Sequence, residues 1–384
     1  MITRDIAYIG VDDTDLDLFE SQYIIPNGIS YNSYLIKDEK IAIMDTADNR
    51  KIDEWLGNLR TALDGRTPDY LVVQHMEPDH AGCIAEILEE YPAIKIVASA
   101  RAIQMMPQFF EGKDFSQNAI AVKEGDTLCL GEHTLQFFMA PMVHWPEVMV
   151  TYDKKDKVVF SADGFGKFGA LSHEEDWACE ARRYYFNICG KYGGPVQALL
   201  KKLATLDVEC ICPLHGPILK ENLGYYIGLY DTWSKYDVET EGVFIAYASI
   251  HGGTAAVANV MAEILREKGA KKVSVADLNR DDMAEAIEDA FRMDKMIVAA
   301  ASYDGGVFPV MHDFLHHLQI KAYQKRRVGI IENGSWAPCA GRVMRGMLEQ
   351  MKDVEIVEPM VTILSRMKQS DRAALEALAD AILK

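Results

Sequence analysis

The sequence lacks three features, and each shortage excludes a class of protein. It has no apolar run near the roughly 18 residues that a membrane-spanning helix needs, and its first residues, MITRD, lack the apolar segment of an export signal. Its seven cysteines contain no Cys-x-x-Cys pair, which argues against a disulfide framework and against a built-in cysteine-ligated metal module. Basic residues are scarce: 40 Lys and Arg against 58 Asp and Glu give a net charge of -18, which disfavours nucleic acid and anionic membranes. We therefore expect a cytoplasmic protein that binds neither.

The run QHMEPDH at 74–80 holds the densest group of potential metal ligands in the chain. It follows a short apolar run at 70–73, which predicts a buried strand, and precedes a segment with helical spacing at 81–88. In α/β folds, chemistry gathers where a strand ends. Four ligands within six residues exceed what one ion takes from one loop, so the spacing favours two adjacent ions. The ligating positions are His75, Glu77, Asp79 and His80.

Three more candidate ligands each follow a strand-like run: His144, Asp163 and His215. The chain therefore offers four histidines and three carboxylates to one pair of ions. A carboxylate can bridge two ions, and Asp163 is the natural bridge because it arrives alone between the others. Imidazole suits zinc, iron and copper, whereas added carboxylate favours harder ions. Glu77 therefore favours iron over zinc.

These motifs resemble the metallo-β-lactamase-like domain of the flavodiiron proteins, also called A-type flavoproteins. The resemblance is carried by the 75–80 loop, by HWP at 144–146, DG at 163–164 and HGP at 215–217, and by GISYNSYLI at 28–36. Related zinc hydrolases carry histidine at the position of Glu77, so that residue indicates the flavodiiron branch. In some members the histidine matching His80 is displaced from the metal. The resemblance implies His75, Glu77 and His144 on one iron, Asp79, His80 and His215 on the other, and Asp163 between them.

The two halves of the chain differ in their pattern of elements. Residues 1–240 combine many short strands with helices, which predicts an αββα sandwich of the metallo-β-lactamase-like kind once the resemblance is taken into account. Residues 241–384 alternate five strands with five helices. That alternation predicts a doubly wound parallel sheet of the flavodoxin-like kind. We thus expect an α/β protein with a diiron domain at 1–240 and an FMN-binding domain at 241–384.

Three strand-to-helix loops of the second half are rich in small, hydroxyl and aromatic residues. Backbone N–H groups and hydroxyls at such a turn can surround a phosphate, and a helix N-terminus adds positive potential, although ordinary helix caps share this chemistry. Together the loops resemble the FMN site of flavodoxins, except that the family usually has Tyr and Asn at the positions of His251 and Gly253. The candidate contacts are Ser249, Ile250, His251, Gly252, Gly253, Thr254, Ser302, Tyr303, Asp304, Gly305, Gly306, Asn333, Gly334, Ser335, Trp336 and Ala337.

The combined features predict a flavodiiron oxidoreductase that reduces dioxygen to water, nitric oxide to nitrous oxide, or both. An external donor such as rubredoxin or a reduced deazaflavin is expected, because the chain has no nicotinamide fingerprint and no iron–sulfur cysteines. Two alternatives share the same residues: a dinuclear zinc hydrolase with a flavodoxin-like appendage, and a flavodoxin-type electron carrier. The resemblance also implies a head-to-tail homodimer, or a dimer of dimers.

Three expectations concern residues outside these motifs. Trp145 follows a ligand and either lines the substrate pocket or belongs to the core. His133 fits no metal spacing and is expected at the surface or at a helix cap. The basic run 325–327 is expected on a solvated face.

Overall fold

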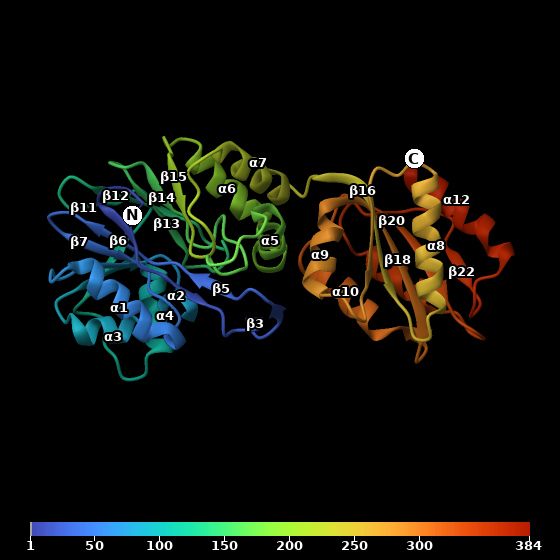
Figure 1. The fold of residues 1–384 in the computed structure, drawn as a ribbon, viewed down its shortest axis with the longest axis horizontal. Coiled ribbons are helices and arrows are strands. Elements are labelled where there is room, and N and C mark those ends of the chain that lie inside the picture. Colours follow the sequence, from blue (N-terminus) through green and yellow to red (C-terminus); the bar gives the residue numbers. More distant parts are fainter. Residues whose placement is uncertain (1) are drawn as a thin grey trace. The chain divides into compact units, whose positions relative to one another are not determined.

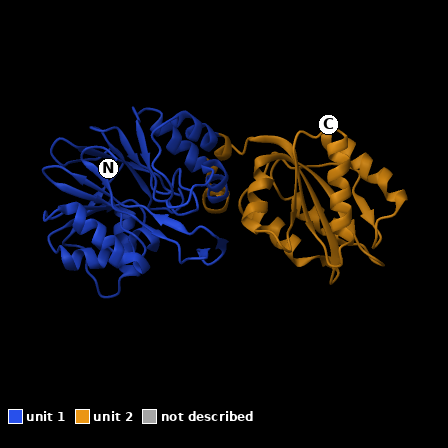
Figure 2. Cartoon of the chain, in the orientation of Figure 1, with its two compact units in different colours: residues 1–185, 194–231 blue, residues 186–193, 232–384 orange. Residues whose placement is uncertain are grey.

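The structure is a computed structural model and describes residues 2–384, which form two compact units. Unit 1 comprises residues 1–185 and 194–231, and unit 2 comprises residues 186–193 and 232–384 (Figure 2). The main boundary therefore falls at residue 232 and not at 240, and segment 186–193 also belongs to unit 2, where the rings of Phe186 and Phe291 stack with centroids 4.3 Å apart. Within residues 2–384, no helix is long and apolar enough to cross a membrane.

Unit 1 contains two larger sheets that face each other. The first has the order β1 (Ile6–Tyr8), β6 (Tyr34–Lys37), β7 (Ile41–Met44), β8 (Tyr70–Val73), β9 (Lys95–Ser99) and β10 (Ala119–Val122). The second has the order β11 (Thr127–Cys129), β12 (Thr134–Met139), β13 (Met149–Asp153), β14 (Val158–Phe160) and β15 (Cys210–Cys212). Apolar side chains of both sheets, such as Met44, Val72, Phe137 and Phe160, form one buried cluster. Burying these facing side chains holds the layers together.

Helices cover both outer faces of this sandwich (Figure 1). One face carries α1 (Ile52–Leu63), α3 (Ile84–Glu90) and α4 (Ala100–Phe109), while α6 (Gly193–Leu203) and α7 (Leu223–Ser234) lie on the other. Helix α1 buries one stripe, including Trp55, Leu59 and Leu63. Two small ribbons complete the unit: β2 (Val11–Asp13) with β5 (Ile29–Tyr31), and β3 (Leu18–Phe19) with β4 (Tyr23–Ile24). The expected αββα sandwich is confirmed.

Unit 2 is built on a parallel sheet. Its order is β17 (Val273–Asp277), β16 (Thr240–Ala248), β18 (Met293–Tyr303) and β20 (Arg327–Asn333), with β21 (Glu355–Ile356) and β22 (Val361–Ile363) both beside β20. The fifth strand is thus interrupted, because Pro359 between its two pieces has no N–H to offer the sheet. A short β19 (Gly306–Val307) pairs with the end of β18. The flavodoxin-like expectation is confirmed.

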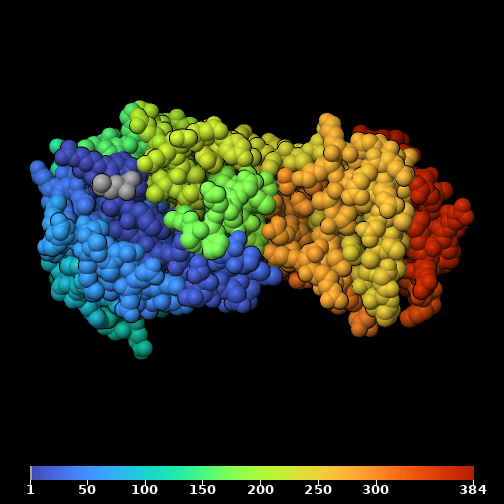
Figure 3. Space-filling model, in the orientation of Figure 1, coloured from blue at the N-terminus to red at the C-terminus, as the bar shows by residue number. Residues whose placement is uncertain are grey.

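The helices of unit 2 follow its strands in alternation. They are α8 (Gly253–Glu267), α9 (Met283–Arg292), α10 (Pro309–Ile320), α11 (Ala340–Leu348) and α12 (Arg372–Leu383). Helices α8 and α12 lie side by side over one face of the sheet (Figures 1 and 3). Because the main strands are parallel, the loops that follow β16, β18, β20 and β22 meet at one edge. That edge positions a large pocket, described below.

Candidate functional site

The structure brings all seven candidate ligands of unit 1 together at the edges of the two facing sheets. His75 and Glu77 leave β8, and Asp79 and His80 lie in the single-turn helix α2 (Pro78–Ala81). The remaining three follow β12, β14 and β15. The donor atoms form two groups, each within 4.8 Å: His75, Glu77, His144 and Asp163 in one, and Asp79, His80 and His215 in the other.

Asp163 lies between these two groups. Its Oδ2 is 3.2 Å from Nε2 of His75 and 3.4 Å from Nε2 of His144. Its Oδ1 is 3.4 Å from Nε2 of His80 and 3.8 Å from Nε2 of His215. Each carboxylate oxygen therefore faces one pair of imidazoles, as a group shared by two cations would.

Hydrogen bonds orient two of the imidazoles from behind. Nδ1 of His75 lies 2.8 Å from Oε1 of Glu147, and Nδ1 of His215 lies 2.7 Å from the backbone oxygen of Ser30. A carbonyl oxygen only accepts, so Nδ1 of His215 donates and Nε2 is left with a free lone pair. Nδ1 of His80, by contrast, is buried without a partner in the described residues.

Negative charge is crowded at this site. Burial raises the pKa of Asp79 to about 7, and the neighbouring Glu77 and Asp163 carboxylates add to the rise. Although burial opposes ionisation of Glu77, hydrogen bonds from His144 and His75 hold the pKa of that carboxyl well below its ordinary value. Both oxygens of Asp79 and both oxygens of Asp163 are buried without hydrogen-bond partners in the described chain. Converging, unpartnered carboxylate oxygens fit bound cations, because cations would supply the missing partners.

Aromatic side chains enclose the ligands on two sides. The ring of Trp145 lies 5.2 Å from that of His75 and stacks on Phe109 at 6.4 Å. On the other side, the rings of Phe19 and Tyr184 lie 5.4 Å and 5.5 Å from that of His215. Trp145 is half-buried beside the ligands. These rings keep the immediate surroundings of the candidate centre apolar.

Sequence reasoning missed several residues that support this centre. Glu147 follows His144 by three residues. Because metal-ligating histidines often donate their second N–H to a carboxylate, an acidic residue at this position could have been predicted to support a ligand. Ser30 acts through its backbone oxygen, for which its residue type gives no signal. Glu20 was missed as well: although Glu20 is exposed to solvent, partial desolvation of its carboxyl and the charge of Glu77 raise its pKa, so this carboxyl lies in the field of the ligands.

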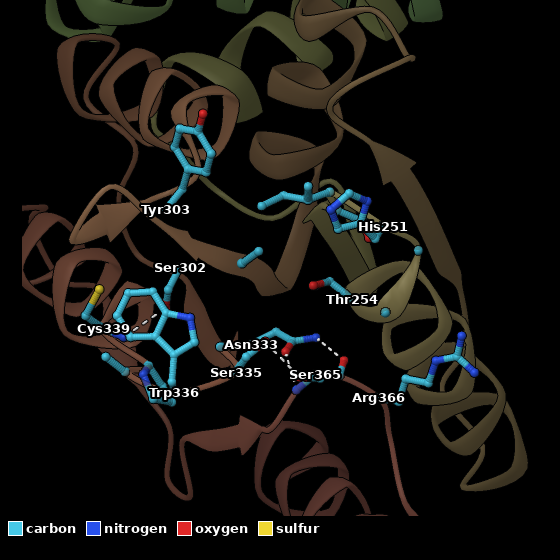
Figure 4. A pocket seen from close by; sticks show the side chains of 18 of the residues that line it. His251, Thr254, Ser302, Tyr303, Asn333, Ser335, Trp336, Cys339, Ser365 and Arg366 are labelled. Atoms are coloured by element: carbon cyan, nitrogen blue, oxygen red, sulfur yellow. Dashed lines mark hydrogen bonds between the residues drawn. The ribbon is translucent and has the colours of Figure 1, made fainter.

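Unit 2 carries a pocket of about 880 Å³ at the strand edge described above. It is lined by all but one of the residues expected at the FMN site, the exception being Gly306. Figure 4 shows Tyr303 and Trp336 near one end of this pocket and His251 and Thr254 near the other. The loop after β22 was not expected at this site, yet it contributes Ser365, Arg366 and Met367 to the lining. Residues 364–368 contain no glycine and only one hydroxyl residue, so no local pattern indicated a binding loop there.

The pocket has the features that a phosphorylated flavin needs. The hydroxyl of Ser249 is buried without a partner in the described chain, and Thr254 is buried in the first turn of α8. The side chain of Trp336 is 92% exposed, so its ring faces remain free to stack. Gly253, where the family usually has Asn, is required locally: a Cβ there would lie 2.6 Å from the backbone oxygen of Ser365.

Two expectations about other residues were wrong. His133 is fully buried, and its Nδ1 lies 2.9 Å from Oδ2 of the buried Asp153. Arg326 is only 2% exposed rather than solvated, and its guanidinium donates to backbone oxygens that include those of Met293 and Tyr236. A buried guanidinium needs such acceptors, and these tie residues 236–237, which precede β16, to the start of β18.

Comparison with known proteins gives three kinds of match. The family model described as ODP family beta lactamase matches residues 29–216. An uncharacterized protein of Methanocaldococcus jannaschii is 30% identical over 91% of this chain and 89% of its own length. The anaerobic nitric oxide reductase flavorubredoxin of Escherichia coli is 28% identical over 88% of this chain and 72% of its own length. The structure of the rubredoxin oxygen:oxidoreductase of Desulfovibrio gigas matches with a TM-score of 0.93 and 26% identity, covering 100% of this chain and 97% of that one.

Proposed function

Because the chain belongs to the flavodiiron protein family, we propose that it reduces dioxygen to water, nitric oxide to nitrous oxide, or both. It is an oxidoreductase whose cofactors are FMN and a non-haem diiron site. The relatives' printed names support both gases: one is a nitric oxide reductase and another a rubredoxin oxygen:oxidoreductase. When bound, FMN would supply electrons singly or in pairs and a diiron site would deliver them to the gas: four electrons and four protons for dioxygen to two waters, and two of each for two nitric oxide molecules to nitrous oxide and water.

We assign His75, Glu77 and His144 to one iron, Asp79, His80 and His215 to the other, and Asp163 to both. The position of the Asp163 carboxylate carries this proposal, because each of its oxygens faces a different pair of imidazoles at 3.2–3.8 Å. Glu147 and the Ser30 carbonyl keep His75 and His215 in fixed orientations. The rings of Phe19, Tyr184 and Trp145 lie against the ligand imidazoles and would exclude bulk water from them.

FMN is assigned to the pocket of unit 2. Loop 249–254 and the first turn of α8 would hold the phosphate through backbone N–H groups and hydroxyls. The loops after β18 and β20 would hold the ring system, with the exposed Trp336 against its face. The orphaned hydroxyl of Ser249 supports the phosphate end of this assignment.

The proposed function also requires an electron donor and an oligomeric state that brings FMN to the irons. An external donor, such as rubredoxin or a reduced deazaflavin, would reduce the FMN in the cytoplasm. The candidate iron ligands belong to unit 1 and the pocket to unit 2. A head-to-tail homodimer, or a dimer of dimers, would let the flavin of one chain serve the irons of another.

The deciding experiment supplies dioxygen and nitric oxide separately to the purified holoprotein with a reduced donor, in an otherwise anaerobic cell, and measures the consumption of each gas. Iron content and the flavin absorption spectrum are determined on the same sample. Two irons and one flavin per chain with consumption of at least one gas support the proposal. Consumption of neither gas by a fully loaded sample would sink the proposed activity, and bound zinc without flavin would sink the cofactor assignment as well.

A further inference from the structure

Arg366 is the only lysine or arginine that lines the pocket in the described chain. Its guanidinium forms no hydrogen bond and no ion pair with any described residue. Three other arginines of unit 2 form ion pairs, Arg327 with Glu355, Arg345 with Glu358, and Arg372 with Glu267, whereas Arg280 and Arg342 form none with the described residues and lie outside the pocket lining. What distinguishes Arg366 from other unpaired cations of the chain is its place in the lining of the pocket, which points to an anionic partner outside the protein.

The loop that carries Arg366 is held firmly. The side-chain amide of Asn333 donates to the backbone oxygen of Ser365 at 2.9 Å, and Asn333 accepts from the N–H of Ser365 at 3.0 Å. The ammonium of Lys368 donates to the backbone oxygens of Leu364 at 2.8 Å and Arg366 at 3.0 Å. The backbone on both sides of Arg366 is therefore fixed before any ligand binds, which lowers the entropic cost of using its side chain.

The same loop lies against the candidate phosphate loop. The backbone oxygen of Ser365 is so close to Gly253 that it would be 2.6 Å from a Cβ there. Figure 4 shows Arg366 beside the start of α8, at the same end of the pocket as Thr254. At this end the buried Ser249 hydroxyl has no partner in the described chain, and the helix N-terminus adds positive potential. Asp304, the one carboxylate in the lining, belongs to a different loop.

We propose that Arg366 pairs with the phosphate of FMN, so that loop 364–367 is a fourth wall of the cofactor site and selects phosphorylated flavin over riboflavin. This inference rests on the proposed assignment of FMN to the pocket. Hydroxyls and backbone N–H groups bind a phosphate without neutralising its charge, whereas a guanidinium supplies both donors and a full positive charge. Arg366 is thus a specificity-determining residue for the cofactor and has no part in the reaction at the irons.

The test compares the affinities of FMN and riboflavin for full-length, iron-loaded protein from which FMN has been removed, measured by quenching of flavin fluorescence. Arg366→Ala is expected to raise the Kd of FMN about tenfold at low salt and to change that of riboflavin by less than about twofold. High salt should shrink the FMN effect. Arg366→Lys should retain part of the selectivity, because it keeps the charge without the planar donor pair.

Lys352→Ala is the matched control, since the exposed Lys352 precedes β21 at the opposite edge of the sheet. It removes one positive charge and should leave both affinities unchanged. An unchanged FMN affinity in Arg366→Ala, or equal losses for FMN and riboflavin, would overturn the role of Arg366 and leave the proposed function standing. Failure of the wild-type protein to bind FMN would overturn both.

Discussion

Nε2 of His80 and Nε2 of His215 lie 3.0 Å apart in the buried centre of unit 1. Oδ2 of Asp79 lies 3.3 Å from each of them. These two nitrogens and one oxygen lie close together and away from water. A single proton can form a hydrogen bond between only two of the three atoms, so the third would remain without a partner. A cation placed among them would interact with all three. The donor atoms of Asp79, His80 and His215 thus converge as closely as those of the group that contains Glu77.

The two histidines of this pair should not contribute equally to iron binding. The Ser30 carbonyl fixes the tautomer of His215 at 2.7 Å, whereas Nδ1 of His80 has no partner in the described residues. A ligand with a fixed orientation binds metal more strongly, and loss of such support typically costs about 10–100-fold in affinity. We expect His215→Asn to lose more iron than His80→Asn. Iron content after dialysis against a chelator measures this, and equal losses would contradict the argument.

Asp163→Asn should be more damaging than Asp79→Asn. Both substitutions remove one negative charge and keep the side-chain size, so they form a matched pair. Asp163 faces imidazoles of both groups, while Asp79 faces only His80 and His215. An amide is a poor bridge between cations, so we expect Asp163→Asn to release both irons and Asp79→Asn to release mainly one. Flavin content should stay normal in both, and identical iron stoichiometries would show that Asp163 is terminal.

The buried pair His133–Asp153 should make stability depend on pH. Burial alone would lower the pKa of His133, but the hydrogen bond with Asp153 and its charge outweigh burial and raise that pKa above its ordinary value. Lys155, which pairs with Asp5, opposes the rise, and Asp156 favours it. Because the folded-state pKa is the higher one, the stabilisation is full below the unfolded pKa of about 6.5 and is lost as pH rises through the folded-state pKa.

His133→Gln should therefore lower the thermal midpoint of unit 1 most near pH 5.5 and least near pH 9. A charged hydrogen bond contributes roughly 1.5–3 kcal/mol, which corresponds to a shift of several degrees. Asp153→Asn is the companion variant and should show the same trend. A difference from wild type that does not change with pH would mean that His133 stays neutral in the folded protein.

Which features were predictable depends on how local their causes are. The loop at 74–80 could be assigned because four ligand types stand next to each other in sequence, and the five strands of unit 2 could be assigned because their apolar runs recur in a regular alternation. Ser30 and Ser365 could not be found, because each acts through its backbone and is brought to its site by pairing across the fold. Arg326 was misplaced because a buried cation needs backbone acceptors from distant segments, which no local pattern reveals.

If the flavin of one chain serves the irons of its partner, two inactive variants should rescue each other. Gly253→Val should block the FMN pocket, because its Cβ would meet the backbone oxygen of Ser365 at 2.6 Å. Asp163→Asn should empty the metal centre while the flavin stays bound. Subunit exchange between them would give hybrids in which one chain supplies the flavin and the other the irons. Since half of randomly paired dimers are hybrids with one of two sites complete, recovery of about a quarter of wild-type turnover is expected.

The rescue needs proof that hybrids form, so the two variants carry different affinity tags and the doubly tagged fraction is isolated. The control is a mixture of two pocket variants, Gly253→Val and Trp336→Ala, which both keep an intact metal centre. Subunit exchange between them should add no activity beyond that of Trp336→Ala alone. Doubly tagged dimers that contain both flavin and iron and yet remain inactive would exclude transfer between chains. Full activity of the wild-type chain as a monomer would exclude it too, because each chain would then have to serve its own irons.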